Sequence, residues 1–268
     1  RLAAAVARRL GAALEAGRAV RALSVSIGGP LDTARGIIYS PPNLPGWDAI
    51  PLKALLEERF GLPAHVQHDG AAGAIAEWRF GAGRGAENLV FLTMGTGLGA
   101  GLILNGRVYR GATDLAGEVG HVRIAPDGPE VYGKRGSWEG YGAGPAFGRL
   151  AVEMFPARWG AGVETPEVVA LALAGDADAL AVVRRVADYF GQGLAILADL
   201  LNPEVIVVGS MGVRLGEVLL APAREALRRE ALPGAYTACR VVPAALGERL
   251  GDVAALSAAI EAARGAGG

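Results

Sequence analysis

The pattern of apolar and polar positions along this chain predicts a mixed α/β protein. Short apolar runs predict strands at 21–29, 63–69, 204–209 and 240–244. Stretches with helical spacing predict helices at about 1–16, 50–60, 70–79, 140–155 and 177–201, a helix that ends near 230, and one from about 252 onward. Glycines without an apolar period at 81–88 predict a linker. Such mixing of strands and helices is typical of α/β folds.

The strongest local pattern is the segment LVFLTMGTGLGAGLILNG, 89–106. Two apolar runs flank a glycine-rich turn, which predicts a β-hairpin. Gly95, Gly97 and Gly99 lack side chains, so backbone N–H groups there can approach an anion closely, and Thr96 adds a hydroxyl. The segment therefore indicates a phosphate-binding turn, with an ordinary tight hairpin as the open alternative.

Composition narrows the function classes. The 268 residues carry a formal net charge of −1, and no basic block recurs, which argues against nucleic-acid binding by this chain. Cys239 is the single cysteine, which excludes disulfide staples and thiolate metal cages and fits a reducing cytosol. No apolar run reaches transmembrane length. The chain opens without Met on a helix already under way, so we expect it to be a fragment.

A carboxylate stands at the end of the strand predicted at 63–69. Asp69 opens the following helix, where it can cap a free N–H group of the first turn. The carboxyl ends of strands are also where α/β folds bind ligands, and a carboxylate there can take a proton from a hydroxyl. Asp69 is therefore a candidate general base, and the two roles can coexist.

Further polar residues suit a polyol. Glu118 and His121 flank two glycines, and Glu139 stands at a predicted helix start. Asn43 offers an amide in a proline-rich turn, where Trp47 can pack on a sugar ring. Each also has a structural explanation, such as a first-turn partner of the helix dipole for Glu139.

The order of these motifs resembles the ROK family of sugar kinases and repressors. The series reads PPNLPGW, HDGAAGAIAE, GTGLGAG, GEVGH, a glycine-rich stretch that ends in Trp-Glu, and PEVIVVGS. The resemblance implies two α/β lobes of the actin-like, ribonuclease-H-like type with a cleft between them. We expect one lobe at 1–86, completed by the helix at 252–268, and the other at 87–251.

The resemblance also implies roles for individual residues. Asp69 matches the catalytic base. The sugar-contacting positions are matched by Asn43, His68, Glu118, His121 and Glu139. The second phosphate loop is matched by Gly95, Thr96, Gly97 and Gly99, and the turn near the adenosine by Gly209 and Gly212.

Three departures from the family pattern carry weight. His68 stands where the family usually has Asn before the catalytic Asp. Glu130, Tyr132 and Ser137 stand where the family has the three cysteines of a zinc segment, so we expect no structural zinc. The D-x-G-G-T phosphate loop that opens the family pattern is absent, and we expect it before Arg1. We therefore assign no metal ligand, and expect that this chain alone cannot turn over.

The resemblance implies an ATP- and Mg²⁺-dependent kinase that phosphorylates a hexose at its primary hydroxyl, working in the cytoplasm as a homodimer with no membrane partner. The alternative is the sugar-sensing domain of a ROK-type repressor whose DNA-binding segment lies outside this chain. Asp69 and the intact glycine turn favour the kinase, because a sensor needs neither. The residues do not name the sugar.

Overall fold

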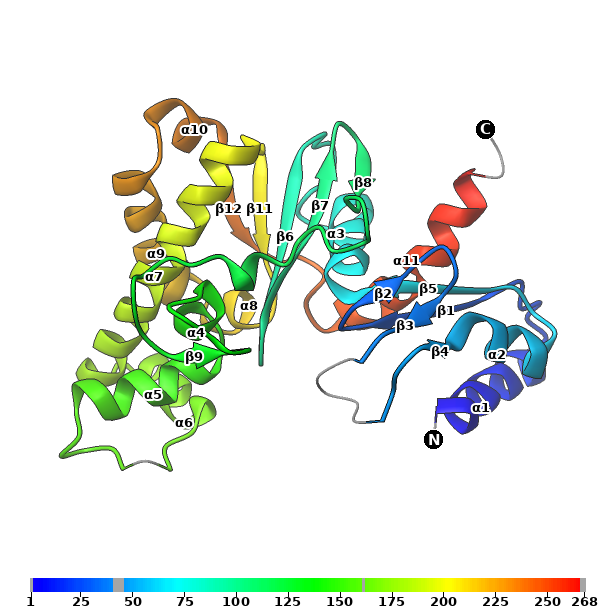
Figure 1. The fold of residues 1–268 in the computed structure, drawn as a ribbon, viewed down its shortest axis with the longest axis horizontal. Helices are drawn as coiled ribbons and strands as arrows, with labels where there is room; N and C mark the ends of the chain where they lie inside the picture. Colours follow the sequence, from blue (N-terminus) through cyan, green and yellow to red (C-terminus); the bar gives the residue numbers. More distant parts are fainter. Residues whose placement is uncertain (1, 41–45, 161, 266–268) are drawn as a thin grey trace.

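The computed structural model describes residues 2–40, 46–160 and 162–265. Its largest sheet has five strands in the order β12–β11–β6–β7–β8 (Figure 1). These strands are β6 (Leu89–Met94), β7 (Leu98–Leu104), β8 (Arg107–Tyr109), β11 (Val205–Val208) and β12 (Arg240–Pro243). β6 and β7 form the antiparallel hairpin that the sequence predicts, while β11 runs parallel to both β6 and β12.

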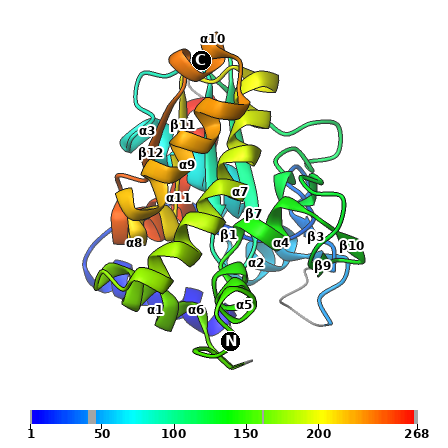
Figure 2. The same cartoon turned by 90° about the vertical axis from the view of Figure 1, so that its left-hand side faces the viewer.

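Both faces of this sheet are buried, because successive side chains of a strand point to opposite faces. On one face Val90 and Leu92 join a core with the helices that follow residue 137. On the other face Leu89 and Phe91 pack against α3 (Asp69–Phe80). The first set of helices is α4 (Trp138–Gly142), α5 (Pro145–Met154), α6 (Thr165–Leu173), α7 (Ala177–Leu201), α8 (Met211–Leu215), α9 (Glu217–Glu230) and α10 (Pro233–Ala238). Figure 2 shows α7 and α9 lying side by side across the sheet.

The N-terminal part is smaller. β1 (Leu23–Ile27) pairs in parallel with β5 (Ala64–His68), and β2 (Leu31–Asp32), β3 (Ile37–Ile38) and β4 (Ile50–Pro51) form an antiparallel sheet. The helices here are α1 (Leu2–Glu15) and α2 (Leu52–Phe60). The C-terminal helix α11 (Leu250–Gly265) returns to pack on both α3 and β1 (Figure 1). Because α3 packs on the five-stranded sheet, the lobe boundaries at 86 and 251 remain a proposal.

Several elements differ from the sequence prediction. The helix expected at 140–155 is two helices, because Pro145 has no N–H group to continue α4 and starts α5 instead. The helix expected to end near 230 is likewise α8 and α9. Helices α6 and α10 were not predicted. The stretch expected as loop before 138 contains β8, the 3₁₀ turn η1 (Val119–His121), β9 (Glu130–Val131) and β10 (Lys134–Arg135). A further 3₁₀ turn, η2 (Gly247–Arg249), leads into α11.

The topology brings three chain segments to one place. Ile27 lies opposite His68 in the parallel pair, so β1 and β5 end at the same edge. The start of α3 then crosses β7 closely, since a Cβ atom on Gly101 would lie 2.0 Å from the carbonyl oxygen of Gly70. Only glycine fits there. The close crossing places Asp69 next to the glycine turn between β6 and β7.

Candidate active site

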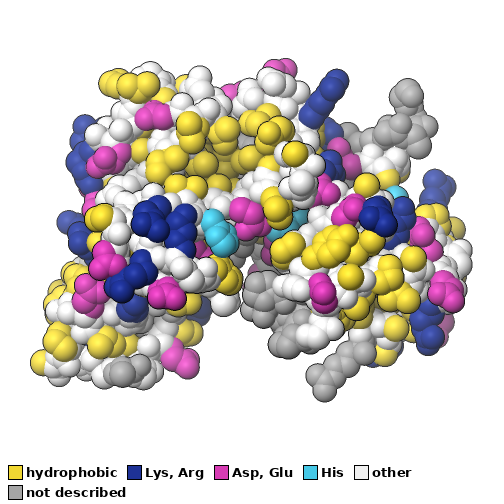
Figure 3. All heavy atoms as spheres, viewed as in Figure 1, with side chains coloured by type: hydrophobic (Ala, Val, Ile, Leu, Met, Phe, Trp, Pro, Cys, Tyr) yellow, Lys and Arg dark blue, Asp and Glu magenta, His cyan; other side chains and the backbone are white. Residues whose placement is uncertain are grey.

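A cleft of about 710 Å³ lies where these segments meet. Five of the predicted site side chains line it: His68, Asp69, Glu118, His121 and Glu139. Gly97 and Gly99 of the glycine turn line it as well. In Figure 3, histidine and acidic side chains gather near the middle of the visible face, between the two halves of the molecule. Asn43 lies outside the described residues. A larger hollow of about 1100 Å³ adjoins the cleft at Pro30 and Leu115 but holds none of these seven residues.

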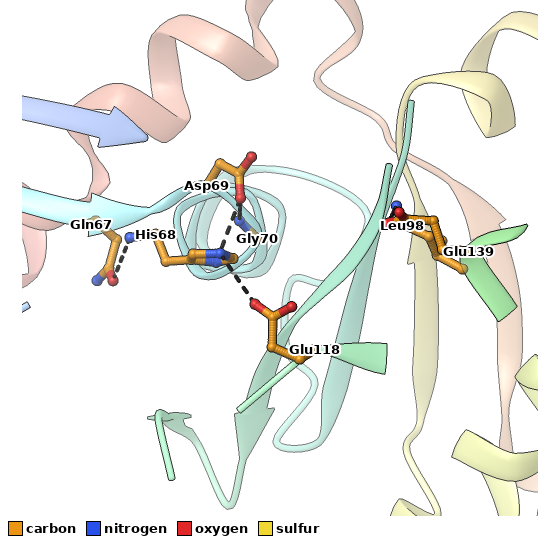
Figure 4. Close-up of polar contacts among 7 residues, drawn as sticks. All are labelled: Gln67, His68, Asp69, Gly70, Leu98, Glu118 and Glu139. Atoms are coloured by element: carbon orange, nitrogen blue, oxygen red, sulfur yellow. Dashed lines mark hydrogen bonds and ion pairs between the residues drawn. The ribbon is translucent and has the colours of Figure 1, made fainter. Parts of the chain in front are cut away.

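Asp69 is held at the start of α3. Its Oδ1 atom accepts a hydrogen bond of 2.7 Å from the N–H group of Gly70, and His68 Nδ1 lies 3.5 Å away (Figure 4). His68 occupies the N-cap position, and Asp69 is in the first helical turn. The carboxylate still has 49% of its surface exposed. It therefore has a fixed position and an open side toward the cleft, so the hydrogen bond to Gly70 leaves the carboxylate free for a base role, which stays a prediction.

His68 connects two carboxylates. Its Nε2 atom lies 3.8 Å from Glu118 Oε1, on the opposite side of the ring from Asp69 (Figure 4). The neighbouring residue, Gln67, points away from this group and accepts the N–H of His68. An imidazole between two carboxylates can donate to one of them through either ring nitrogen. The residue that departs from the family pattern is thus part of the polar network around Asp69.

Glu139 reaches the glycine turn. Its Oε2 atom accepts a hydrogen bond of 2.8 Å from the N–H of Leu98. A Cβ atom on Gly97 would lie 2.9 Å from the same oxygen. Ser137 caps the start of α4, the helix that carries Glu139, and its hydroxyl accepts the N–H of Gly140. Glu139 therefore does more than balance a helix dipole, because it joins the cleft to the phosphate-type turn.

The turn itself fits an anion. Its backbone closes through a 3.0 Å hydrogen bond from the N–H of Gly95 to the carbonyl of Gly97. Within the described part of the chain, the N–H groups of Thr96 and Gly97 donate no hydrogen bond, and Thr96 is exposed. Free backbone donors on a tight turn suit phosphate oxygens.

The glycines assigned to the adenosine have a packing explanation. A Cβ atom on Gly209 would lie 2.9 Å from the Phe91 ring, and one on Gly212 would lie 2.6 Å from the Val208 side chain. Neither glycine lines the cleft. Contact with a nucleotide at Gly209 and Gly212 therefore stays a prediction.

The segment at the expected zinc position forms a different arrangement. The rings of His121 and Tyr132 stack with centroids 5.2 Å apart and an angle of 13° between their planes. Burial, followed by the nearby charges of Glu139 and Glu118, raises the pKa of the Tyr132 hydroxyl. Among the described residues, no group of three or more His, Cys, Asp or Glu could hold a metal. The side chains present do not fit a zinc site, and the absence of zinc stays a prediction.

Sequence reasoning missed part of the cleft wall. Gly28, Gly29, Thr93 and Tyr132 also line the cleft. The end of β1 could have been found, because parallel neighbours such as β1 and β5 finish at the same sheet edge. Tyr132 could not have been assigned to the cleft from the sequence, because a tyrosine in a glycine-rich stretch carries no periodic signal.

Known proteins resemble this chain in sequence and in fold. The sequence model of the ROK family matches residues 1–262. A glucokinase of Halalkalibacterium halodurans is 35% identical over 86% of this chain and 74% of its own length. The structure of a ROK family glucokinase from Streptomyces griseus, in complex with glucose and AMPPNP, superposes with a TM-score of 0.81 at 34% identity, covering 96% of this chain and 86% of the other. A xylose repressor of Bacillus spizizenii is 26% identical over 89% of this chain and 61% of the repressor. The fold is thus the two-lobed, actin-like α/β fold of ROK sugar kinases.

Proposed function

The chain belongs to the ROK family, and from that premise we propose that it is a sugar kinase that transfers the γ-phosphoryl group of ATP to the primary hydroxyl of a hexose. The observation that carries this proposal is the convergence of Asp69, Glu118, His121 and Glu139 with the glycine turn in one cleft. A polyol needs several convergent polar partners, and a phosphoryl donor needs backbone donors beside them. The resemblance to glucokinases supports the same activity.

We assign the proton transfer to Asp69. The hydroxyl of the sugar loses its proton to the free side of the carboxylate as its oxygen attacks the γ-phosphorus, the bond from that phosphorus to the bridging oxygen breaks, and ADP leaves. The bond from the Gly70 N–H and the neighbouring His68 hold the carboxylate in place for that step. Positioning of this kind supplies much of the catalysis in phosphoryl transfer.

The remaining residues bind and orient. Glu118, His121 and Glu139 hydrogen-bond sugar hydroxyls, and the N–H groups of Thr96 and Gly97 donate to phosphate oxygens. A divalent cation would neutralise charge on the phosphates when bound. We assign no residue of the chain to that cation, so no step of the reaction is assigned to a metal.

A second candidate function is sugar sensing within a ROK-type repressor. The likeness to a xylose repressor over 89% of this chain favours it. Asp69 and the unpaired amides of the glycine turn favour the kinase, because sugar binding alone requires neither. We further propose that the protein works in the cytoplasm and as a homodimer.

The deciding experiment is a phosphorylation assay with ATP and a panel of hexoses and N-acyl amino sugars, run on the full-length protein and on its Asp69→Asn variant. The substitution keeps the shape of the side chain but removes its basicity. We expect turnover to fall by roughly 10²-fold or more while sugar binding persists. Asp252→Asn is the matched control, since Asp252 also lies in the first turn of a helix but does not line the cleft.

Two outcomes would contradict the proposal. Undiminished turnover in Asp69→Asn would remove Asp69 from the chemistry. Sugar binding without phosphorylation of any hexose by the unaltered protein would favour the sensor.

A further inference from the structure

A short hairpin at the mouth of the cleft has an unusual turn. β9 and β10 pair antiparallel and are joined by Tyr132 and Gly133, with backbone φ angles of +51° and +69°. Two-residue hairpin turns with positive φ at both positions strongly favour Asn-Gly. Tyrosine is a poor residue for the left-handed conformation, because its Cβ atom crowds the backbone. A bulky side chain held in such a position points to a function for that side chain.

Two side chains of this hairpin contact His121, one at its ring and one at its backbone. The ring of Tyr132 lies parallel to the imidazole of His121, with their centroids 5.2 Å apart. The ammonium group of Lys134, in β10, donates a hydrogen bond to the carbonyl of His121. His121 is therefore fixed at its ring and at its backbone by one hairpin.

The stacked pair belongs to the cleft. His121 and Tyr132 both line it, with Glu118 and Glu139 close enough to act on the Tyr132 hydroxyl. His121 is exposed, so little else restrains its ring. A ring whose face is covered by Tyr132 presents its edge, which carries both nitrogens, to other partners. The stack thus selects one orientation of a polar group at the entrance to the site.

We propose that Tyr132 is a positioning residue that holds the imidazole edge of His121 toward the sugar. The stacked tyrosine ring thereby also fixes the hairpin of β9 and β10 against His121. The proposal rests on the proposed sugar kinase function and adds a determinant of sugar affinity to it. It predicts that the stack matters for sugar binding and that the Tyr132 hydroxyl does not.

The test compares Tyr132→Asn with Tyr132→Phe. Asparagine suits the turn better than tyrosine and removes the ring, so this variant should fold with an equal or higher melting temperature. We expect its KM for the sugar to rise by about tenfold, with kcat and the KM for ATP within about twofold of the unaltered protein. Tyr132→Phe keeps the stack and should match the unaltered protein in all three values. Tyr109→Asn, at an exposed tyrosine on β8, is the control.

A spectroscopic readout makes the test independent of activity. The chain has three histidines, so their ring signals can be assigned by NMR. The His121 signals should move in Tyr132→Asn and stay in place in Tyr132→Phe, while those of His65 and His68 change in neither. If no sugar is phosphorylated by the unaltered full-length protein, the proposed function fails, and these signals still decide whether the stack exists.

The proposal is overturned by an unchanged sugar KM in Tyr132→Asn, by equal losses in the Asn and Phe variants, or by His121 signals that do not respond to loss of the ring.

Discussion

At the scale of single residues, the Glu139 carboxylate has two roles, one in the fold and one proposed in sugar binding. Its carboxylate accepts the N–H of Leu98, at the start of β7, and also faces the cleft. The hydrogen bond requires only an oxygen acceptor, whereas binding of a sugar hydroxyl is strongest when the acceptor is charged. The two roles can therefore be separated by substitution.

We expect Glu139→Gln to keep the fold and lose sugar affinity. The glutamine carbonyl can still accept the Leu98 N–H, so the glycine turn should stay in place, and the KM for ATP should change little. A hydrogen bond to a charged group is worth about 1.5–3 kcal/mol against about 1 for a neutral one, which predicts a rise of roughly tenfold in the KM for the sugar. Steady-state kinetics with each substrate varied in turn measure this. A larger effect on ATP than on the sugar would place Glu139 in the phosphate site instead.

Cys239 allows a prediction about pH. The side chain is buried, and burial raises the pKa of its thiol from 9.0 to about 11. At pH 8 the reactive thiolate should be about 100-fold scarcer than for a free cysteine, so alkylation of the folded protein should be slow. The folded state disfavours the thiolate, so the neutral Cys239 thiol contributes its full stability to the folded protein below pH 9.0. That contribution is lost as the pH rises toward 11.

The measurement is the rate of iodoacetamide labelling at pH 8, with and without urea. Labelling in urea should proceed at the rate of an ordinary cysteine. Equally fast labelling of the folded protein would mean that Cys239 is exposed.

At the scale of elements, the β6–β7 hairpin and the long helix α7 could be predicted from the sequence because their apolar patterns are long and regular. The burial of β6 follows the expected alternation, since Val90 and Leu92 face one side of the sheet and Leu89 the other. The boundary at Gly144 and Pro145 was missed, because alanine and glycine on both sides of the break continue an apparently helical stretch. The hairpin of β9 and β10 was also missed, because strands of two residues show no alternation.

The residues of the candidate site likewise fall into those that the sequence could predict and those that it could not. Asp69 and the glycine turn follow strands and are recognised by position, whereas Tyr132 enters the cleft through a backbone conformation that tyrosine rarely adopts. The closeness of Glu139 to Leu98 could not be predicted either, because 41 residues separate them and only the folded topology brings them together.

The crossing of α3 over β7 leaves no room for a side chain at Gly101. A Cβ atom on Gly101 would lie 2.0 Å from the Gly70 carbonyl oxygen, in backbone that cannot move aside without separating helix from strand. We expect Gly101→Ala to lower the free energy of unfolding by about 2 kcal/mol or more, since overpacking of a core costs about 1–3 kcal/mol. Urea denaturation measures this.

Gly11→Ala is the matched control for Gly101→Ala. Nothing lies within 4 Å of the added atom, and Gly11 is inside helix α1. Alanine there should stabilise by ~0.5–1 kcal/mol, because it is the better helix former. A Gly101→Ala protein as stable as the unaltered one would show that α3 and β7 do not meet this closely.

At the scale of the whole molecule, a polar contact links the N-terminal part to the loop that follows β8, in addition to the packing of α3 and α11. Asp114, in the loop after β8, accepts hydrogen bonds of 2.8 and 2.9 Å from the backbone N–H and the hydroxyl of Thr33, next to β2. Pro30 and Leu115, close to these two residues along the chain, line the cleft. The contact between Thr33 and Asp114 therefore joins two chain segments that carry walls of the site.

We expect Asp114→Gly to weaken sugar binding more than it weakens the fold. Asp114 has a φ angle of +60°, a conformation that glycine adopts freely, so the backbone of the loop is not strained by the substitution. Both bonds to Thr33 are lost, together with the 3.7 Å ion pair between Asp114 and Arg110, which is partly exposed and contributes little. Binding must then include the cost of bringing the cleft walls together, which predicts a sugar Kd raised by about three- to tenfold with little change in melting temperature. Asn105→Gly is the control, because Asn105 has a similar φ of +52° in the turn between β7 and β8, where no cleft residue lies. Isothermal titration with the sugar measures the effect. An unchanged Kd in Asp114→Gly would mean that the packing of α3 and α11 alone holds the two halves in their binding geometry.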